Sequence, residues 1–358
     1  LLPTHGQPPQ EFNTIKFGKC SFNASGQTSE FPMATPFKQP LFVFPGQGSQ
    51  YCGIGRDIYD QYSVVRDLYS EASDIVGYDM AALSFDDPQE QIHLTRFTQP
   101  VLLTHQIACL TIFNENTSVP IQPKATAGHS LGEYSALVAA GALDFASALR
   151  LVCERGRLMG ELGEGEMEAL PLPLDEAKAL AENHYCSVAA CNLPDQTVVG
   201  GRAEDLDALI GTLEALHPGK RSARLKTEGA FHTFYMIAAA LKFRETLSDA
   251  PIQTPATDVL SNASGVFHTP EPDAIRAALF SQLFNPVLWH SNLIHAVDSG
   301  CDSIIEFGGG IGKGESAAEK KPNLAGIVKK TFRRYENPPA YAAVINEQTL
   351  LDTTAAVV

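Results

Sequence analysis

The sequence has few basic residues for its length. Its 26 lysines and arginines stand against 41 aspartates and glutamates, which gives a formal net charge of −15 over 358 residues. A domain that binds nucleic acid needs a basic face to collect phosphates. We therefore expect no nucleic-acid partner.

Long apolar runs are absent as well. No stretch approaches the roughly 20 apolar residues that a membrane-spanning helix needs. The first residues also lack the basic start, apolar middle and small-residue cleavage site of a signal peptide. We expect a cytoplasmic protein with no membrane association. The chain begins with Leu1 rather than Met, so we expect a processed chain or one cut from something longer.

Cysteine is scattered and unpatterned. The count of seven is odd, and the one close pair, Cys186 and Cys191, has neither the spacing of a zinc knuckle nor that of a redox C-x-x-C motif. This usage is typical of reduced cysteines in a cytoplasmic protein. Metal-ligand spacing appears nowhere else in the sequence, so we expect no bound metal.

Hydrophobic residues make up 44% of the chain and charged residues 19%, an ordinary globular composition. Residues 1–38 are rich in Pro, Gly, Ser, Asn and Gln without a sustained period, which predicts a linker or an arm lying on the domain. After Arg334 the sequence contains Pro338-Pro339 and ends in small residues, so we predict a C-terminal linker or tail over 335–358.

Between these ends, short apolar runs alternate with helical patterns, which indicates an α/β fold. We expect a large α/β-hydrolase-like domain with a parallel sheet, formed by residues 39–165 and 229–334. Its main elements are predicted as strands at Pro40–Phe44, Ala125–Ala127 and Ile304–Phe307 (the last core strand) and helices at Ile58–Val76, Gln99–Asn114 and Tyr134–Ala140.

Residues 166–228 have a different pattern, with the order β-α-β-β-α-β of a small ferredoxin-like unit. We predict that this segment is a subdomain inserted into the large domain. Its strands are predicted at Met167–Leu172, Ser187–Asn192, Gln196–Gly201 and Ser222–Leu225, and its helices at Leu174–Asn183 and Glu204–Leu216.

The chain contains one G-x-S-x-G motif, Gly128-His129-Ser130-Leu131-Gly132. Between a strand and a helix, such a motif forms a sharp turn that lifts the serine hydroxyl clear of the backbone. The helix that follows directs its amide groups and positive dipole end at the same place. Ser130 is therefore the predicted nucleophile.

A serine hydroxyl becomes nucleophilic when a base takes its proton. Of the ten histidines, we favour His232, which follows the insert and precedes a predicted helix in a loop-like setting. His129 adjoins the serine, but the geometry of the turn should direct its side chain away, into packing.

Several further motifs occur in a fixed order between Leu41 and Lys330. With the G-x-S-x-G segment and its continuation Glu133-Tyr134, the chain resembles the malonyl-CoA:acyl-carrier-protein transacylase family, which includes acyltransferase domains of polyketide and fatty acid synthases. The other matching stretches are Phe44-Pro45-Gly46-Gln47-Gly48-Ser49-Gln50, Thr98-Gln99-Pro100, Arg155-Gly156-Arg157-Leu158-Met159, Ala230-Phe231-His232 and Gln282-Leu283-Phe284-Asn285-Pro286-Val287.

The resemblance implies a role for each motif. Ser130 would attack a thioester carbonyl, and His232 would act first as base and then as acid. A backbone carbonyl at Gln282 would orient that histidine in place of an aspartate. The backbone N–H groups of Gln47 and Leu131 would hold the oxyanion, where losing one donor typically costs about 10²–10³ in rate.

The resemblance also implies the substrate. Arg155 stands where the family places the arginine that grips the free carboxylate of a malonyl group, a task suited to the forked guanidinium. Phe231, Leu131 and Asn192 would select the acyl group, and Phe231 favours malonyl over methylmalonyl. A small polar substituent, as in hydroxymalonyl, stays open because Gly229 and Thr233 depart from the family pattern.

The resulting hypothesis is a transacylase with no bound cofactor. Its substrate would be a coenzyme A thioester such as malonyl-CoA, and its acceptor the phosphopantetheine thiol of an acyl carrier protein in polyketide or fatty acid biosynthesis. Other modules of a synthase are further possible partners. The alternatives are the same fold using a substituted unit delivered by a carrier protein, a serine thioesterase or hydrolase, and a non-catalytic docking domain.

Two basic clusters are candidates for docking an acidic carrier protein or the phosphates of coenzyme A. The other interpretation of each is a solvated charged face. The first cluster is Lys220, Arg221, Arg224 and Lys226, and the second is Lys329, Lys330, Arg333 and Arg334.

Overall fold

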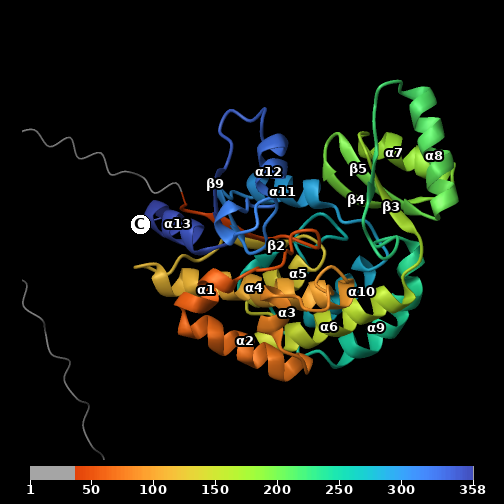
Figure 1. The fold of residues 1–358 in the computed structure, drawn as a ribbon. Helices are drawn as coiled ribbons and strands as arrows, with labels where there is room; N and C mark the ends of the chain where they lie inside the picture. Colours follow the sequence, from red (N-terminus) through yellow and green to blue (C-terminus); the bar gives the residue numbers. More distant parts are fainter. Residues whose placement is uncertain (1–36, 358) are drawn as a thin grey trace, which may run out of the picture. The chain divides into compact units, whose positions relative to one another are not determined.

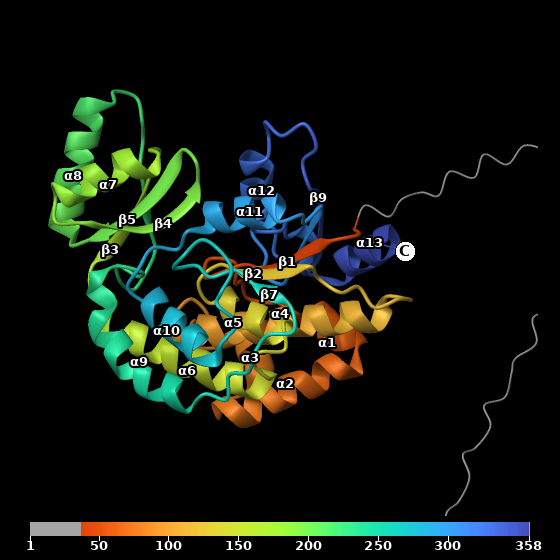
Figure 2. The ribbon, with the colours of Figure 1, turned by 180° about the vertical axis from the view of Figure 1, so that it is seen from behind.

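The computed structural model of the chain describes residues 37–357. Within that range the chain forms a five-stranded parallel sheet of order β7-β2-β1-β8-β9 and a four-stranded sheet of order β4-β5-β3-β6 (Figures 1 and 2). The strands of the larger sheet are β1 (Pro40–Phe44), β2 (Ala125–Gly128), β7 (Asp258–Val259), β8 (Ser303–Phe307) and β9 (Ala340–Val344).

The three central strands β1, β2 and β8 are buried along their whole length. Parallel strands covered on both faces have near-continuous apolar sequences, which is why Pro40–Phe44 is recognisable without alternation. The rings of Phe42 and Phe113 both lie against Phe307, with centroids 4.8 and 5.3 Å away. This cluster holds β1, β8 and α4 together.

Helices cover both faces of this sheet. Figures 1 and 2 show α4, α5 and α6 on one face and α11 and α12 on the other. The helices of the large subdomain are α1 (Arg56–Gln61), α2 (Ser63–Val76), α3 (Met80–Phe85), α4 (Thr95–Asn116), α5 (Gly132–Ala139), α6 (Phe145–Leu162), α9 (Ile237–Asp249), α10 (Pro272–Gln282), α11 (Trp289–Asp298), α12 (Ala325–Thr331) and α13 (Glu347–Val357).

The single helix predicted over Ile58–Val76 is wrong, because the chain breaks it into α1 and α2. Tyr62 is extended between them, with φ −111° and ψ 122°. The guanidinium of Arg66 donates to the carbonyls of Tyr59 and Asp60 at the end of α1. A side chain from α2 thus donates the hydrogen bonds that backbone N–H groups would have donated to these carbonyls if α1 had continued.

The four-stranded sheet has the strand order of a β-α-β-β-α-β ferredoxin-like unit. Alternate residues along its strands face opposite ways. Leu170 and Val199 pack into a separate cluster with the two helices, whereas Met167 and Val198 line a pocket on the other face of the sheet. Its elements are β3 (Glu166–Leu170), α7 (Leu174–Glu182), β4 (Ser187–Leu193), β5 (Gln196–Gly201), α8 (Ala203–Leu216) and β6 (Ala223–Leu225).

A backbone bridge ties the small sheet to the large subdomain. Val287, which precedes α11, donates its N–H to the Ala189 carbonyl at 3.0 Å and accepts from the Cys191 N–H at 2.8 Å. These bonds use the free edge of β4, which would otherwise expose unpaired polar groups. They fix the small sheet beside the carboxyl ends of β1 and β2.

The linker or tail predicted over 335–358 is wrong, because this segment forms β9 and α13. The prediction that β8 is the last core strand is wrong for the same reason. β9 pairs in parallel with β8 along five residues, and α13 buries Leu350 and Val357. The Tyr341 hydroxyl donates to the buried carboxylate of Glu306 on β8. The small residues of β9 carry little strand signal by themselves, because pairing along an existing strand supplies most of their stability.

The N-terminal linker or arm predicted over 1–38 lies almost wholly outside the described residues. Phe37 and Lys38 are described, and the Phe37 side chain is buried against the core. In the described part of the chain, no helix is both long and apolar enough to cross a membrane.

Replacing Leu350 with alanine tests whether the C-terminal segment is part of the core. Leu350 is fully buried, whereas its neighbour Leu351 on the same helix is 53% exposed. We expect Leu350→Ala to lower the free energy of unfolding by about 2–5 kcal/mol, as deletion of buried methyl groups does. Leu351→Ala is the matched control in urea denaturation, and equal midpoints for the two variants would contradict a packed α13.

Candidate active site

The G-x-S-x-G motif forms a sharp turn between β2 and α5. Ser130 sits at its apex with a φ of +54°, in the left-handed region that ordinary residues rarely adopt. A Cβ on Gly128 would lie 1.8 Å from the Gly132 carbonyl carbon, and one on Gly132 would lie 2.2 Å from the Phe44 oxygen. Glycine at both positions is therefore a steric requirement for bringing strand and helix this close.

The Ser130 hydroxyl lies 2.7 Å from Nε2 of His232. The other ring nitrogen, Nδ1, lies 2.8 Å from the main-chain carbonyl of Gln282. A carbonyl only accepts, so Nδ1 carries the proton and Nε2 is left as the acceptor that faces the serine. The ring is thus held in the tautomer that a base needs.

His232 is buried in a positively charged environment. Loss of hydration, together with the nearby guanidinium of Arg155, lowers the pKa of His232 to about 3. The imidazole is therefore neutral at physiological pH and ready to accept a proton.

In the described part of the chain, two backbone N–H groups beside the nucleophile lack a hydrogen-bond acceptor of their own. Within residues 37–357, the amides of Gln47, after β1, and Leu131, at the start of α5, have no hydrogen-bond acceptor. Both residues line the pocket that contains Ser130. The positive end of the α5 dipole lies at the same position and favours developing negative charge there.

The side chain of Arg155 extends from α6 to the Ser130 hydroxyl, and only 1% of the residue's surface is exposed. Its Nη1 donates to Oε1 of Gln99 at 2.7 Å. Its Nη2 donates to Oε1 of Gln282 at 2.9 Å and to Oγ of Ser130 at 3.1 Å. All three acceptors are neutral oxygens.

In the part of the chain that the structure describes, no carboxylate lies within ion-pair distance of Arg155. The buried Nε–H has no hydrogen-bond partner there either. Burial lowers the pKa of Arg155 because the charged form has lost its water. A buried cation without an anion is costly, so the site favours an incoming carboxylate beside the guanidinium, whose Nη2 lies 3.1 Å from Oγ of Ser130.

A polar network behind the nucleophile was not found from the sequence. Oδ1 of Asn262 accepts from the Ser130 N–H at 2.6 Å, and Nε2 of Gln282 donates to the Ser130 carbonyl at 2.9 Å. The same Gln282 amide donates to Glu133, whose other oxygen lies 2.6 Å from Nε2 of His268. Glu133 follows the serine motif and was visible there, but Asn262 and His268 are too distant in sequence to give a signal.

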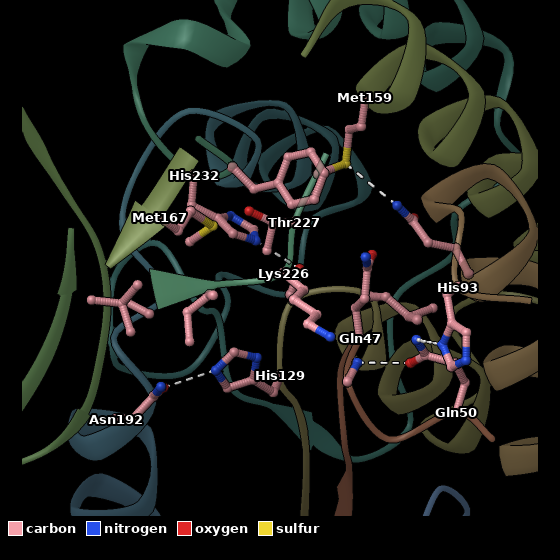
Figure 3. Close-up of a pocket in the computed structure, with 18 of the residues that line it drawn as sticks. Gln47, Gln50, His93, His129, Met159, Met167, Asn192, Lys226, Thr227 and His232 are labelled. Carbon is pink, nitrogen blue, oxygen red and sulfur yellow. Dashed lines mark hydrogen bonds between the residues drawn. The ribbon is translucent and has the colours of Figure 1, made fainter. Parts of the chain in front are cut away.

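The pocket at this site has a volume of about 660 Å³ and is lined by both subdomains (Figure 3). The predicted acyl-selecting residues Phe231, Leu131 and Asn192 all line it. The remaining lining residues had no role in this pocket assigned from the sequence. Gln50 and Met159 lie in the quoted motifs and Lys226 in the first basic cluster, and the others come from segments without a motif. They include Gln50, His93, Met159, Met167, Ala190, Val198, Leu225, Lys226 and Thr227.

His129 lies differently from its prediction. Its ring contacts Trp289 edge-on at 5.6 Å, but it also lines the pocket instead of pointing wholly into packing. Nε2 of His129 lies 2.9 Å from Oδ1 of Asn192 on β4 (Figure 3). This contact joins the nucleophile turn to the small sheet.

The two basic clusters differ in the structure. Arg224 in the first is paired internally with Glu166, Glu168 and Asp207, so it holds β6 and α8 together and is not free for a partner. All four residues of the second cluster are exposed on α12 and just after it. Within residues 37–357, no group of three or more His, Cys, Asp or Glu side chains could hold a metal ion.

Comparison with known proteins agrees with this geometry. Residues 41–308 match the family described as "Acyl transferase domain". A malonyl CoA-acyl carrier protein transacylase of Bacillus subtilis (strain 168) is 38% identical over 303 residues, which are 82% of this chain and 90% of that protein.

Solved structures give the same result. The malonyl CoA-acyl carrier protein transacylase from Coxiella burnetii superimposes with a TM-score of 0.80 at 31% identity, over 90% of this chain and 99% of that one. A malonyl-transacylase solved in complex with its type II polyketide synthase acyl-carrier protein gives 0.78 at 32% identity, over 89% and 99%. The predicted fold class and family resemblance are confirmed, and the chain belongs to the acyl transferase family.

Proposed function

We propose that this acyltransferase moves a malonyl unit from coenzyme A to Ser130 and then to the phosphopantetheine thiol of an acyl carrier protein. The observation that carries the proposal is the buried guanidinium of Arg155, which lacks a carboxylate partner and lies 3.1 Å from the Ser130 hydroxyl. A receptor for a free carboxylate beside a nucleophile fits an acyl group with a second acid at its far end.

In the first half-reaction, Nε2 of His232 takes the Ser130 proton as Oγ bonds to the thioester carbonyl carbon. The carbonyl oxygen becomes an oxyanion held by the N–H groups of Gln47 and Leu131. The C–S bond then breaks, and the imidazolium returns its proton to the departing coenzyme A sulfur. The product is a malonyl ester on Ser130.

The second half-reaction reverses these roles. His232 takes the proton of the phosphopantetheine thiol, whose sulfur attacks the Ser130 ester. The same two N–H groups hold the oxyanion, and the imidazolium protonates Oγ as the C–O bond breaks. Atoms and charge balance with the two thiols and these side chains, so the proposal uses no resident cofactor.

Arg155 positions the malonyl group in both steps. Its carboxylate would take the place of neutral acceptors on Nη1 and Nη2, which gains a charge-assisted bidentate pair. Phe231, only 5% exposed, narrows the space beside the acyl chain and supports malonyl over a unit with a larger substituent. Leu131 and Asn192 bound the same space.

A serine thioesterase or hydrolase is the weaker alternative. Such enzymes orient their histidine with an acidic residue, whereas Nδ1 of His232 meets the Gln282 carbonyl. A carboxylate receptor has no function in hydrolysis of an ordinary fatty acyl ester.

We also propose the division into a large subdomain, 39–165 with 229–334, and a small one over 166–228. β9 and α13 extend the larger sheet and its cover. A reducing cytoplasmic location is supported by the cysteines, six of which lie in described segments as free thiols. The acyl carrier protein is the proposed partner, and it belongs to a polyketide or fatty acid pathway.

Loading of Ser130 is the direct test of the proposed function. We expect intact-protein mass spectrometry to show one malonyl adduct after incubation with malonyl-CoA, and none on Ser130→Ala. Ser248→Ala, on the exposed side of α9, is the matched control and should load like the wild type. An adduct that persists on Ser130→Ala would contradict the assignment of the nucleophile.

Replacing Arg155 tests the carboxylate receptor. We expect Arg155→Ala to lower kcat/KM for malonyl-CoA by about 10²-fold or more, as loss of a buried charge pair does, while acetyl-CoA loses much less. Arg157→Ala is the matched control, because that arginine lies on the same helix but pairs with Glu154 and Glu161 at the surface. Equal losses with the two donors would contradict carboxylate recognition.

The acidic limb of the pH profile reports the base. Protonated His232 cannot accept the Ser130 proton, so kcat/KM falls as the pH drops through the pKa of His232. Burial and the charge of Arg155 lower this pKa to about 3. We expect kcat/KM for malonyl-CoA to stay level from pH 8 to pH 5, with circular dichroism confirming an intact fold. A limb near pH 6.5, the usual value for histidine, would contradict this environment.

A further inference from the structure

The active-site pocket runs from a buried floor to an exposed rim. Arg155 and His232 at its floor are 1% and 5% exposed. Gly48, His93 and Lys226 line the same pocket and are exposed. A substrate therefore enters past these three residues to reach the nucleophile.

This direction fixes how the substrate lies, if the proposed function holds. The malonyl carboxylate lies against Arg155 and the carbonyl carbon at Ser130. The thioester sulfur and the pantetheine arm must then run outward to the rim. The arm ends in a phosphate ester in both substrates: in coenzyme A it continues into a diphosphate, and in the carrier protein it is joined to the protein as a phosphodiester.

Lys226 is a cation placed at that rim. It directly follows β6, whose pairing with β3 anchors its backbone, and Figure 3 shows its side chain among the residues that line the pocket. The pocket lining contains Arg155 and Lys226 but no Asp or Glu. In the described part of the chain, Lys226 forms no salt bridge.

His93 supplies a second donor on another element, the segment before α4. Oε1 of Gln50 accepts from the Gly48 N–H at 2.7 Å, so the Gln50 amide nitrogen is the group that meets Nδ1 of His93, at 3.2 Å. Nδ1 is therefore an acceptor, which leaves Nε2 as the N–H donor of the ring. In Figure 3, His93 and Lys226 lie on opposite sides of Gln47.

We propose that Lys226 and His93 form a phosphate subsite at the pocket mouth, which holds the phosphate of the pantetheine arm in both half-reactions. The chain carries a net charge of −15 and repels a phosphate-bearing substrate at long range. A local cation together with a second N–H donor offsets that repulsion at the pocket mouth, where the arm leaves the protein.

Two donors that differ only in this phosphate test the subsite: malonyl-4′-phosphopantetheine and malonyl-pantetheine. We expect Lys226→Ala to lower kcat/KM for the phosphorylated donor about five- to tenfold, the loss of one partly exposed charge-assisted contact. The loss with malonyl-pantetheine should be several-fold smaller. Lys226→Arg should restore most of the kcat/KM lost with the phosphorylated donor. His93→Ala should also lower kcat/KM more for the phosphorylated donor than for malonyl-pantetheine, but by a smaller factor.

Rapid-quench mass spectrometry separates the two sources of phosphate, because it measures loading from malonyl-CoA and transfer from malonyl-enzyme to holo carrier protein individually. Lys226→Ala should slow both. Lys242→Ala, an exposed lysine on α9 outside the pocket, is the matched control. Raising the salt concentration should reduce the preference of the wild type for the phosphorylated donor.

Two results would overturn the subsite: equal losses with the phosphorylated and unphosphorylated donors, or no loss with either. Failure of the proposed function is distinguishable from both. It would show as no malonyl adduct on wild-type Ser130 from any donor.

Discussion

A positive charge buried without a carboxylate partner is the constraint on which the site depends. Removing a guanidinium from water is costly unless oriented dipoles or an anion replace the water. Here Gln99 on α4 and Gln282 at the end of α10 present neutral oxygens to Arg155. Under the proposed function, an incoming carboxylate would meet a receptor that is already assembled and would gain a charge pairing that the protein itself does not supply.

Gln282 connects this receptor to the rest of the machinery. Its main-chain carbonyl fixes the tautomer of His232, and its side chain accepts from Arg155 while donating to Glu133 and to the Ser130 carbonyl. The proposed base, the proposed carboxylate receptor and the nucleophile turn therefore share one positioning residue. Because catalysis depends on such positioning, displacement of Gln282 moves all three groups together.

The sequence by itself determined the parts of the protein that short-range geometry controls. The turn at Ser130 needs glycine at both Gly128 and Gly132, which lie within one five-residue segment. The turn can therefore be recognised from the sequence as a short continuous motif. Buried strands such as Pro40–Phe44 and the β-α-β-β-α-β order of the small sheet follow from local apolar patterns. Family motifs supplied Arg155, Gln282 and the oxyanion donors, whose roles spacing alone does not give.

Only the tertiary structure decided what depends on distant partners. β9 is a strand because β8 offers it an edge, and Tyr62 divides a helix because Arg66 caps the first half. Asn262 and His268 support the nucleophile from loops far along the chain. His93 and Lys226 line one pocket because segments far apart in the sequence border it. Apart from Lys226, which belongs to a basic cluster, these residues carry no local signal, since their interactions arise only once separate segments pack together.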